Sequence, residues 1–122
     1  MPDILLVEDN HSVAFLLKKE LRDCGYRVAV AFSPDNANTD TRAAAADLVL
    51  VNGACRRASG WDVYHRLRSR CPDSAVMLYL LESWKTADVR WILAAVREVL
   101  SGRHLRQARR LSGEGSLSQT GS

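Results

Sequence analysis

Short apolar runs alternate along the chain with segments whose apolar residues recur every three or four positions. The runs predict strands buried on both faces, at Ile4 to Val7, Arg27 to Phe32, Asp47 to Val51 and Ala75 to Leu81. The periodic segments predict helices, namely from Asn10 to a stop at Gly25, over 37–46, over 60–71, and over about 86–101 to a stop at Gly102. Strand and helix thus alternate four times, which predicts an α/β protein with a parallel sheet and helices on both faces.

Polar residues follow these strands where each one ends. In a parallel α/β sheet, functional side chains gather at the carboxyl ends of the strands. Those ends present Glu8-Asp9, Phe32-Ser33, Asn52-Gly53 and Leu81-Glu82. We therefore expect any site to lie at this edge.

Residues 3 to about 102 resemble the receiver domain of two-component response regulators. The run from Ile4 to Asn10 is similar to the family's first strand with its acidic pair, and Asp47 to Asn52 is similar to the strand that delivers the phosphoacceptor. The intervals from Asp9 to Asn52 and from Asn52 to Gly60 match those of the family. The resemblance implies a flavodoxin-like, doubly wound parallel sheet of four to five strands in three layers, forming a receiver-like domain over residues 1–102.

The chain departs from the family at the phosphoacceptor, where Asn52 replaces the aspartate that becomes phosphorylated. A carboxamide has neither the charge nor the nucleophilic oxygen of a carboxylate, so we expect no phosphoryl transfer at Asn52. By resemblance, Mg²⁺ would be held by Glu8, Asp9 and the carbonyl of Ala54, and the loss of one carboxylate predicts either no cofactor or a weak, vestigial site. The alternative that we favour for Glu8 and Asp9 is a solvated helix N-terminus.

Asn52 is followed by Gly53, and Asn-Gly is the dipeptide most prone to deamidation. Conversion of Asn52 to aspartate is therefore a minor alternative. The other two interpretations are that Asn52 is an inert remnant of the phosphoacceptor, which we favour, or that it helps to recognise a partner. A rigid, buried strand end would slow that reaction.

The family's switch positions are also altered. Leu80 stands where a hydroxyl residue is expected, Glu82 falls on the position of the lysine, and Lys85 is the only nearby lysine. Roughly 17 residues are missing by ordinary element lengths, about one helix plus one strand. Arg56 stands at or beside the usual proline of the loop after the third strand, and we hypothesise that it neutralises Glu8 and Asp9.

Composition and charge narrow the class of protein. The 122 residues and 47% hydrophobic content fit one domain with a real core. The net charge of +3 lies in residues 103–122, which we expect to be a basic and then Ser/Gly-rich flexible tail. No aromatic residue interleaves with its arginines, which disfavours nucleic-acid binding. The three cysteines show no disulfide or zinc spacing, and no secretion signal or membrane span is evident, so we expect a cytoplasmic protein without a membrane partner.

These observations predict a non-enzymatic signalling module that binds a sensor kinase or downstream regulator independently of phosphorylation. Trp84, Trp91 and Arg56 are the candidate partner-binding residues, although tryptophans more often lie in a core. Two alternatives stay open: a working phosphorelay receiver or small phosphoryl-transfer protein using Glu8 and Asp9 with Mg²⁺, and a decayed regulator with little activity. A homodimer is also open, because loss of an edge strand exposes the backbone of the next strand.

Overall fold

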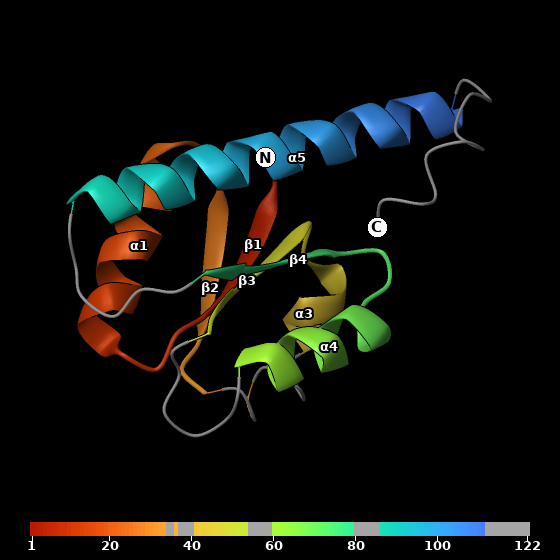
Figure 1. The fold of residues 1–122 in the computed structure, drawn as a ribbon. Coiled ribbons are helices and arrows are strands. Elements are labelled where there is room, and N and C mark those ends of the chain that lie inside the picture. Colours follow the sequence, from red (N-terminus) through yellow and green to blue (C-terminus); the bar gives the residue numbers. More distant parts are fainter. Residues whose placement is uncertain (34–35, 37–40, 54–59, 80–85, 112–122) are drawn as a thin grey trace.

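The computed structural model describes residues 1–33, 36, 41–53, 60–79 and 86–111 of the chain (Figure 1). In chain order, the elements are β1 (Asp3–Val7), α1 (His11–Asp23), β2 (Arg27–Ala31), α3 (Thr41–Ala45), β3 (Leu48–Asn52), α4 (Gly60–Arg70), β4 (Ala75–Tyr79) and α5 (Thr86–Leu111). The predicted alternation of strands and helices is confirmed. No helix within these ranges combines the length and apolarity needed to cross a bilayer.

The strands form one parallel sheet in the order β2-β1-β3-β4. The register places Val7 beside Val51 and Asn52 beside Tyr79, so β1, β3 and β4 end at nearly the same level. This arrangement is the flavodoxin-like parallel sheet that the resemblance implied. Four strands are present among the described residues, at the lower end of the expected range.

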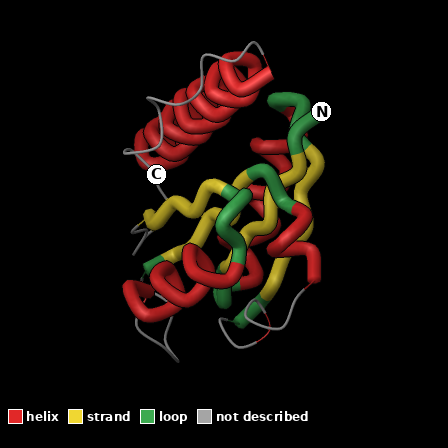
Figure 2. The backbone as a smooth tube through the Cα atoms, turned by 90° about the vertical axis from the view of Figure 1, so that its right-hand side faces the viewer, coloured by secondary structure: helices red, strands yellow, loops and turns green. Residues whose placement is uncertain are grey.

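The side chains of the strands alternate between two apolar clusters, because successive residues of a strand point to opposite faces. On one face, α1 and α5 pack against the sheet through residues such as Leu17, Leu21 and Val96. On the other face, α3 and α4 pack through residues such as Ala43, Val63 and Leu67. Figure 1 shows α5 and α4 on opposite sides of the strands, and in Figure 2 the yellow strands run between red helices. The result is the expected three-layer architecture.

The position of α5 shows where the sheet ends. A helix that led by a right-handed crossover to another parallel strand beyond β4 would cover the same face as α3 and α4. α5 instead lies on the α1 face. It therefore acts as the terminal helix of the fold, and β4 is the last strand of the described sheet.

Several helix ends follow local sequence rules. The Asn10 side chain accepts hydrogen bonds from the backbone N–H groups of Ser12 and Val13, which is an N-cap interaction for α1. Gly25 has φ 96° just after α1, where glycine is favoured. The hydroxyl of Ser33, two residues after β2, accepts a hydrogen bond from the backbone N–H of Asn36 at 3.1 Å.

The end of the last helix differs from the prediction. α5 does not stop at Gly102 but continues to Leu111, so the basic stretch after residue 102 is helical and the predicted domain boundary falls inside α5. A glycine within a helix costs only about 1 kcal/mol relative to alanine, and the arginines, leucines, alanine and glutamine that follow are good helix formers. Residues 112–122, predicted to be a flexible tail, lie outside the described residues.

Candidate functional site

Three polar side chains meet at the carboxyl ends of the central strands. Glu8 follows β1 directly, Asn52 is the last residue of β3, and Tyr79 is the last residue of β4. All three are buried, with 0%, 4% and 7% of their surface exposed. The parallel register is what brings them together, since residues 44 and 71 positions apart in sequence reach the same level of the sheet.

The carboxylate of Glu8 is the centre of this cluster. Its Oε1 accepts one hydrogen bond from Asn52 Nδ2 at 2.8 Å and a second from the Tyr79 hydroxyl at 2.8 Å. Its Oε2 accepts a third from the backbone N–H of Asn10 at 3.1 Å. A buried carboxylate is costly unless it is hydrogen-bonded, and three donors meet that requirement here.

The cluster is anchored to α1 through Asn10. The backbone of Asn10 donates to Glu8, while its side chain caps the first turn of the helix. The N-terminal end of α1 therefore also favours the negative charge of Glu8. Because these bonds link β1, β3, β4 and α1, they hold the edge of the sheet in one arrangement.

This geometry corrects the expectation of a solvated acidic pair. Glu8 is fully buried and accepts hydrogen bonds from Asn52 and Tyr79, whereas Asp9 is half-buried. At this site the carboxamide of Asn52 acts as a hydrogen-bond donor to Glu8. An aspartate at position 52 would lack that donor and would place a second charge against Glu8.

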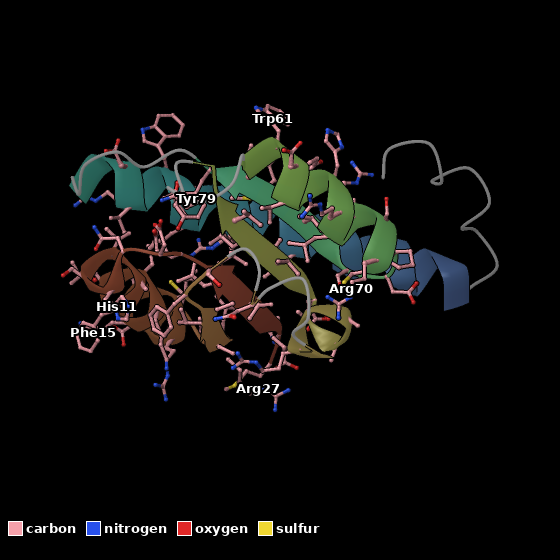
Figure 3. The ribbon with its side chains drawn as sticks, turned by 90° about the horizontal axis from the view of Figure 1, so that it is seen from below. His11, Phe15, Arg27, Trp61, Arg70 and Tyr79 are labelled. Carbon is pink, nitrogen blue, oxygen red and sulfur yellow. The ribbon has the colours of Figure 1, made fainter. Side chains whose placement is uncertain are left out.

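The residue that sequence reasoning missed is Tyr79. By sequence register, Leu80 stands at the position where the family has a hydroxyl residue. The preceding residue, Tyr79, instead supplies a hydroxyl to the cluster around Glu8. A tyrosine that ends an otherwise apolar strand is a usable signal, because a buried phenol needs a hydrogen-bond partner. Figure 3 shows Tyr79 inside the molecule, whereas Trp61 points outward from α4.

The residues present fit a hydrogen-bonded cluster better than a Mg²⁺ site. Mg²⁺ requires several hard oxygen ligands that converge on one point. Oε1 of Glu8 already accepts two hydrogen bonds, and the nitrogen of the Asn52 amide faces it. Within the described part of the chain, no three histidine, cysteine, aspartate or glutamate side chains group as a metal site would need.

The remaining predicted site residues lie mostly in undescribed segments. Those outside the described residues are Ala54, Arg56, Leu80, Glu82, Trp84 and Lys85. Trp91 lies on α5 and is 77% exposed, on the side opposite the core residues Ile92 and Val96. Trp61 on α4 is 62% exposed, so both of these tryptophans lie at the surface and not in the core, which is the more common location of such residues.

The family model of the response regulator receiver domain matches residues 4–101. The fold and this match together define the class, and the chain belongs to the response regulator receiver domain family. No curated protein matches the sequence.

Solved receiver domains share the fold. The receiver domain of HemR from Leptospira biflexa has 23% identity and a TM-score of 0.68, over 83% of this chain and 95% of that one. The receiver domain of a putative LuxO repressor protein from Vibrio parahaemolyticus has 18% identity and a TM-score of 0.73, over 88% and 95%. The response regulator TrrA, in a complex with the histidine kinase ThkA, has 24% identity and a TM-score of 0.67, over 82% and 99%.

Proposed function

We propose that this receiver domain is a signalling module whose protein interactions do not depend on phosphorylation at position 52. The observation that carries the proposal is the buried hydrogen bond, 2.8 Å long, from Asn52 Nδ2 to Glu8 Oε1. It gives the residue at the phosphoacceptor position a structural role and directs its nitrogen, which is not a nucleophile, into the site.

The chemistry of the switch supports the same conclusion. A conformational switch needs a ligand that binds one state better than the other, and a phosphoryl group attached to a carboxylate is that ligand in the family. An amide offers no atom for this bond. The domain would then present one binding surface at all times, with no enzymatic activity and no required cofactor.

The partner that we propose is a protein of the two-component class, a sensor kinase or a downstream regulator. TrrA, which shares the fold, was solved in complex with a histidine kinase. Exposed Trp91 on α5 offers an aromatic contact of the kind enriched at interfaces. The free thiols of Cys24 and Cys71 are in keeping with a cytoplasmic location.

The test is treatment of the pure protein with acetyl phosphate and Mg²⁺, followed by intact mass measurement. We expect the wild type to gain no phosphoryl group. Asn52→Asp is the matched variant, because it changes one atom of the side chain and restores the carboxylate. A mass gain in that variant alone would show that the donor works and that the amide is the block.

A mass gain in the wild type would overturn the proposal and favour the alternative, phosphoryl transfer at Glu8 or Asp9. Glu8→Gln and Asp9→Asn would then locate the acceptor. The full burial of Glu8 argues against this alternative, since two hydrogen bonds already occupy Oε1.

A further inference from the structure

The outer side of β4 carries backbone groups that face away from the sheet. The N–H of Ala75 donates to Asp47, which precedes β3, and the carbonyl of Tyr79 accepts from Gly53, which follows β3. Because the backbone groups of successive residues in a strand point to alternate sides, those of Val76 and Leu78 point outward. No backbone group in the described residues bonds to them.

The side chains of β4 also leave this edge apolar and accessible. Residues Ala75 to Leu78 are half-buried, whereas every residue of β3 is buried. The strand contains no charged residue and no proline, which are the usual devices that protect a sheet edge. α4 and α5 thus cover the two faces of β4 only in part.

The opposite edge of the sheet is protected. In β2, the backbone groups of Arg27 and Ala31 form hydrogen bonds on the β1 side of the strand. Those of Val28 and Val30 therefore point outward. The guanidinium of Arg42 donates to the outward carbonyl of Val30 at 3.3 Å, and Arg27 places an exposed charge at the start of the strand. Among the residues that the structure describes, only the β4 edge therefore offers a row of apolar residues whose outward backbone groups have no hydrogen-bond partner.

We propose that a second copy of this chain adds its own β4, antiparallel, to the outer edge of β4. Val76 then lies opposite Leu78 of the second copy and Leu78 opposite its Val76, with Met77 on the two-fold axis. Each of the two pairs exchanges two hydrogen bonds, which makes four, and the two sheets become one continuous sheet. This inference goes beyond the proposed function and does not depend on it.

The self-complementary pattern is the reason to choose a second copy as the occupant. The outward N–H and C=O groups belong to the residues just before and just after Met77. Their positions are therefore symmetric about Met77 when a second copy of the strand runs antiparallel. Two identical strands therefore match without any offset. Val76 and Leu78 share the α4 side of the sheet, so the pairing also joins two half-buried apolar surfaces.

The register can be tested by cross-linking in full-length protein that carries Cys24→Ser and Cys55→Ser. Two residues facing each other across a two-fold axis as a non-hydrogen-bonded pair have Cα atoms about 4.5 Å apart, which suits a disulfide. Met77→Cys should therefore form a covalent dimer under mild oxidation. Ala75→Cys is the matched control, because Ala75 lies about 14 Å from its own copy in this register and should not cross-link.

A second experiment measures the assembly without added cysteines. Light scattering should give twice the chain mass of 13.6 kDa at high protein concentration. Val76→Pro removes an outward donor that the monomer does not use, and therefore two of the four bonds in the dimer. We expect the dissociation constant to rise at least tenfold. Val28→Pro makes the same change at the protected edge and should leave the dissociation constant unchanged.

Each other result overturns the proposal. A monomer at all concentrations excludes the dimer. A dimer in which Met77→Cys does not cross-link, or in which Ala75→Cys cross-links equally well, uses another register or another surface. Equal weakening by both proline variants would assign the effect to stability of the fold, which thermal unfolding of the same samples measures.

Discussion

The strands β3 and β4 are neighbours with similar apolar sequences and different surroundings. They pair residue by residue over five positions, Leu48 with Ala75 through to Asn52 with Tyr79. Every residue of β3 is buried, while β4 reaches full burial only at Tyr79. The difference comes from position in the sheet, since among the described strands β3 has a neighbour on each side and β4 has one. Burial of a strand is therefore set by topology as much as by its own residues.

The comparison is tested most strongly by the same substitution on both strands. Val49 and Val76 are register partners, and both side chains belong to the cluster on the α4 face. Val49→Ala should lower the free energy of unfolding by about 2–4 kcal/mol, because it removes buried methyl groups and leaves a cavity. Val76→Ala should cost about half as much, since Val76 is only half-buried. Equal losses in urea unfolding at low protein concentration would contradict the comparison.

A smaller effect is expected at the Glu8 cluster, where the last residues of β3 and β4, Asn52 and Tyr79, are both buried and both donate to Glu8. Tyr79→Phe removes one of the two donors to Glu8 Oε1 and should lower stability by about 1.5–3 kcal/mol, as expected for a hydrogen bond to a charged group. Tyr64→Phe is the control, because the Tyr64 hydroxyl accepts from Arg68 on the surface of α4. Its loss should change stability by less than about 0.5 kcal/mol. Chemical unfolding of both variants provides the measurement.

The smallest effect on stability is expected outside the sheet, at Trp91. Its side chain is 77% exposed on α5, so Trp91→Ser should change the free energy of unfolding by no more than about 0.5 kcal/mol. A loss of partner binding in the same variant would assign Trp91 to the interface. A large loss of stability would instead show that the indole packs against the fold.

Much of the fold could be predicted from local patterns. The strands are short apolar runs, and α1 begins at Asn10 and ends before Gly25 as capping rules require. The meeting of Glu8 and Asn52 follows from the sheet alone, because parallel strands end at one edge. The flavodoxin-like parallel sheet in three layers followed from the family resemblance, and the strand order and the helices packed on both faces confirm it.

Other features depend on tertiary contacts that no local pattern contains. Buried Glu8 accepts a hydrogen bond from Tyr79, a residue that the sequence placed within an ordinary strand. The continuation of α5 through Gly102 reflects good helix formers on both sides, which outweigh one unfavourable residue. The difference between the two edges of the sheet depends on the hydrogen bond from Arg42 to the carbonyl of Val30, which no local pattern predicts.

The hydrogen bonds around Asn52 and Gly53 also affect how fast Asn52 deamidates as the protein ages. Spontaneous conversion of Asn-Gly begins when the glycine nitrogen attacks the side-chain carbonyl, and both partners are restrained here. The N–H of Gly53 donates to the Tyr79 carbonyl at 2.7 Å, and the amide of Asn52 is bound to Glu8. Conversion should therefore proceed through unfolded molecules. The attack expels ammonia and leaves a cyclic imide that water opens to aspartate or isoaspartate, so the fraction of chains carrying either product at position 52 would record how much time the population has spent unfolded since synthesis.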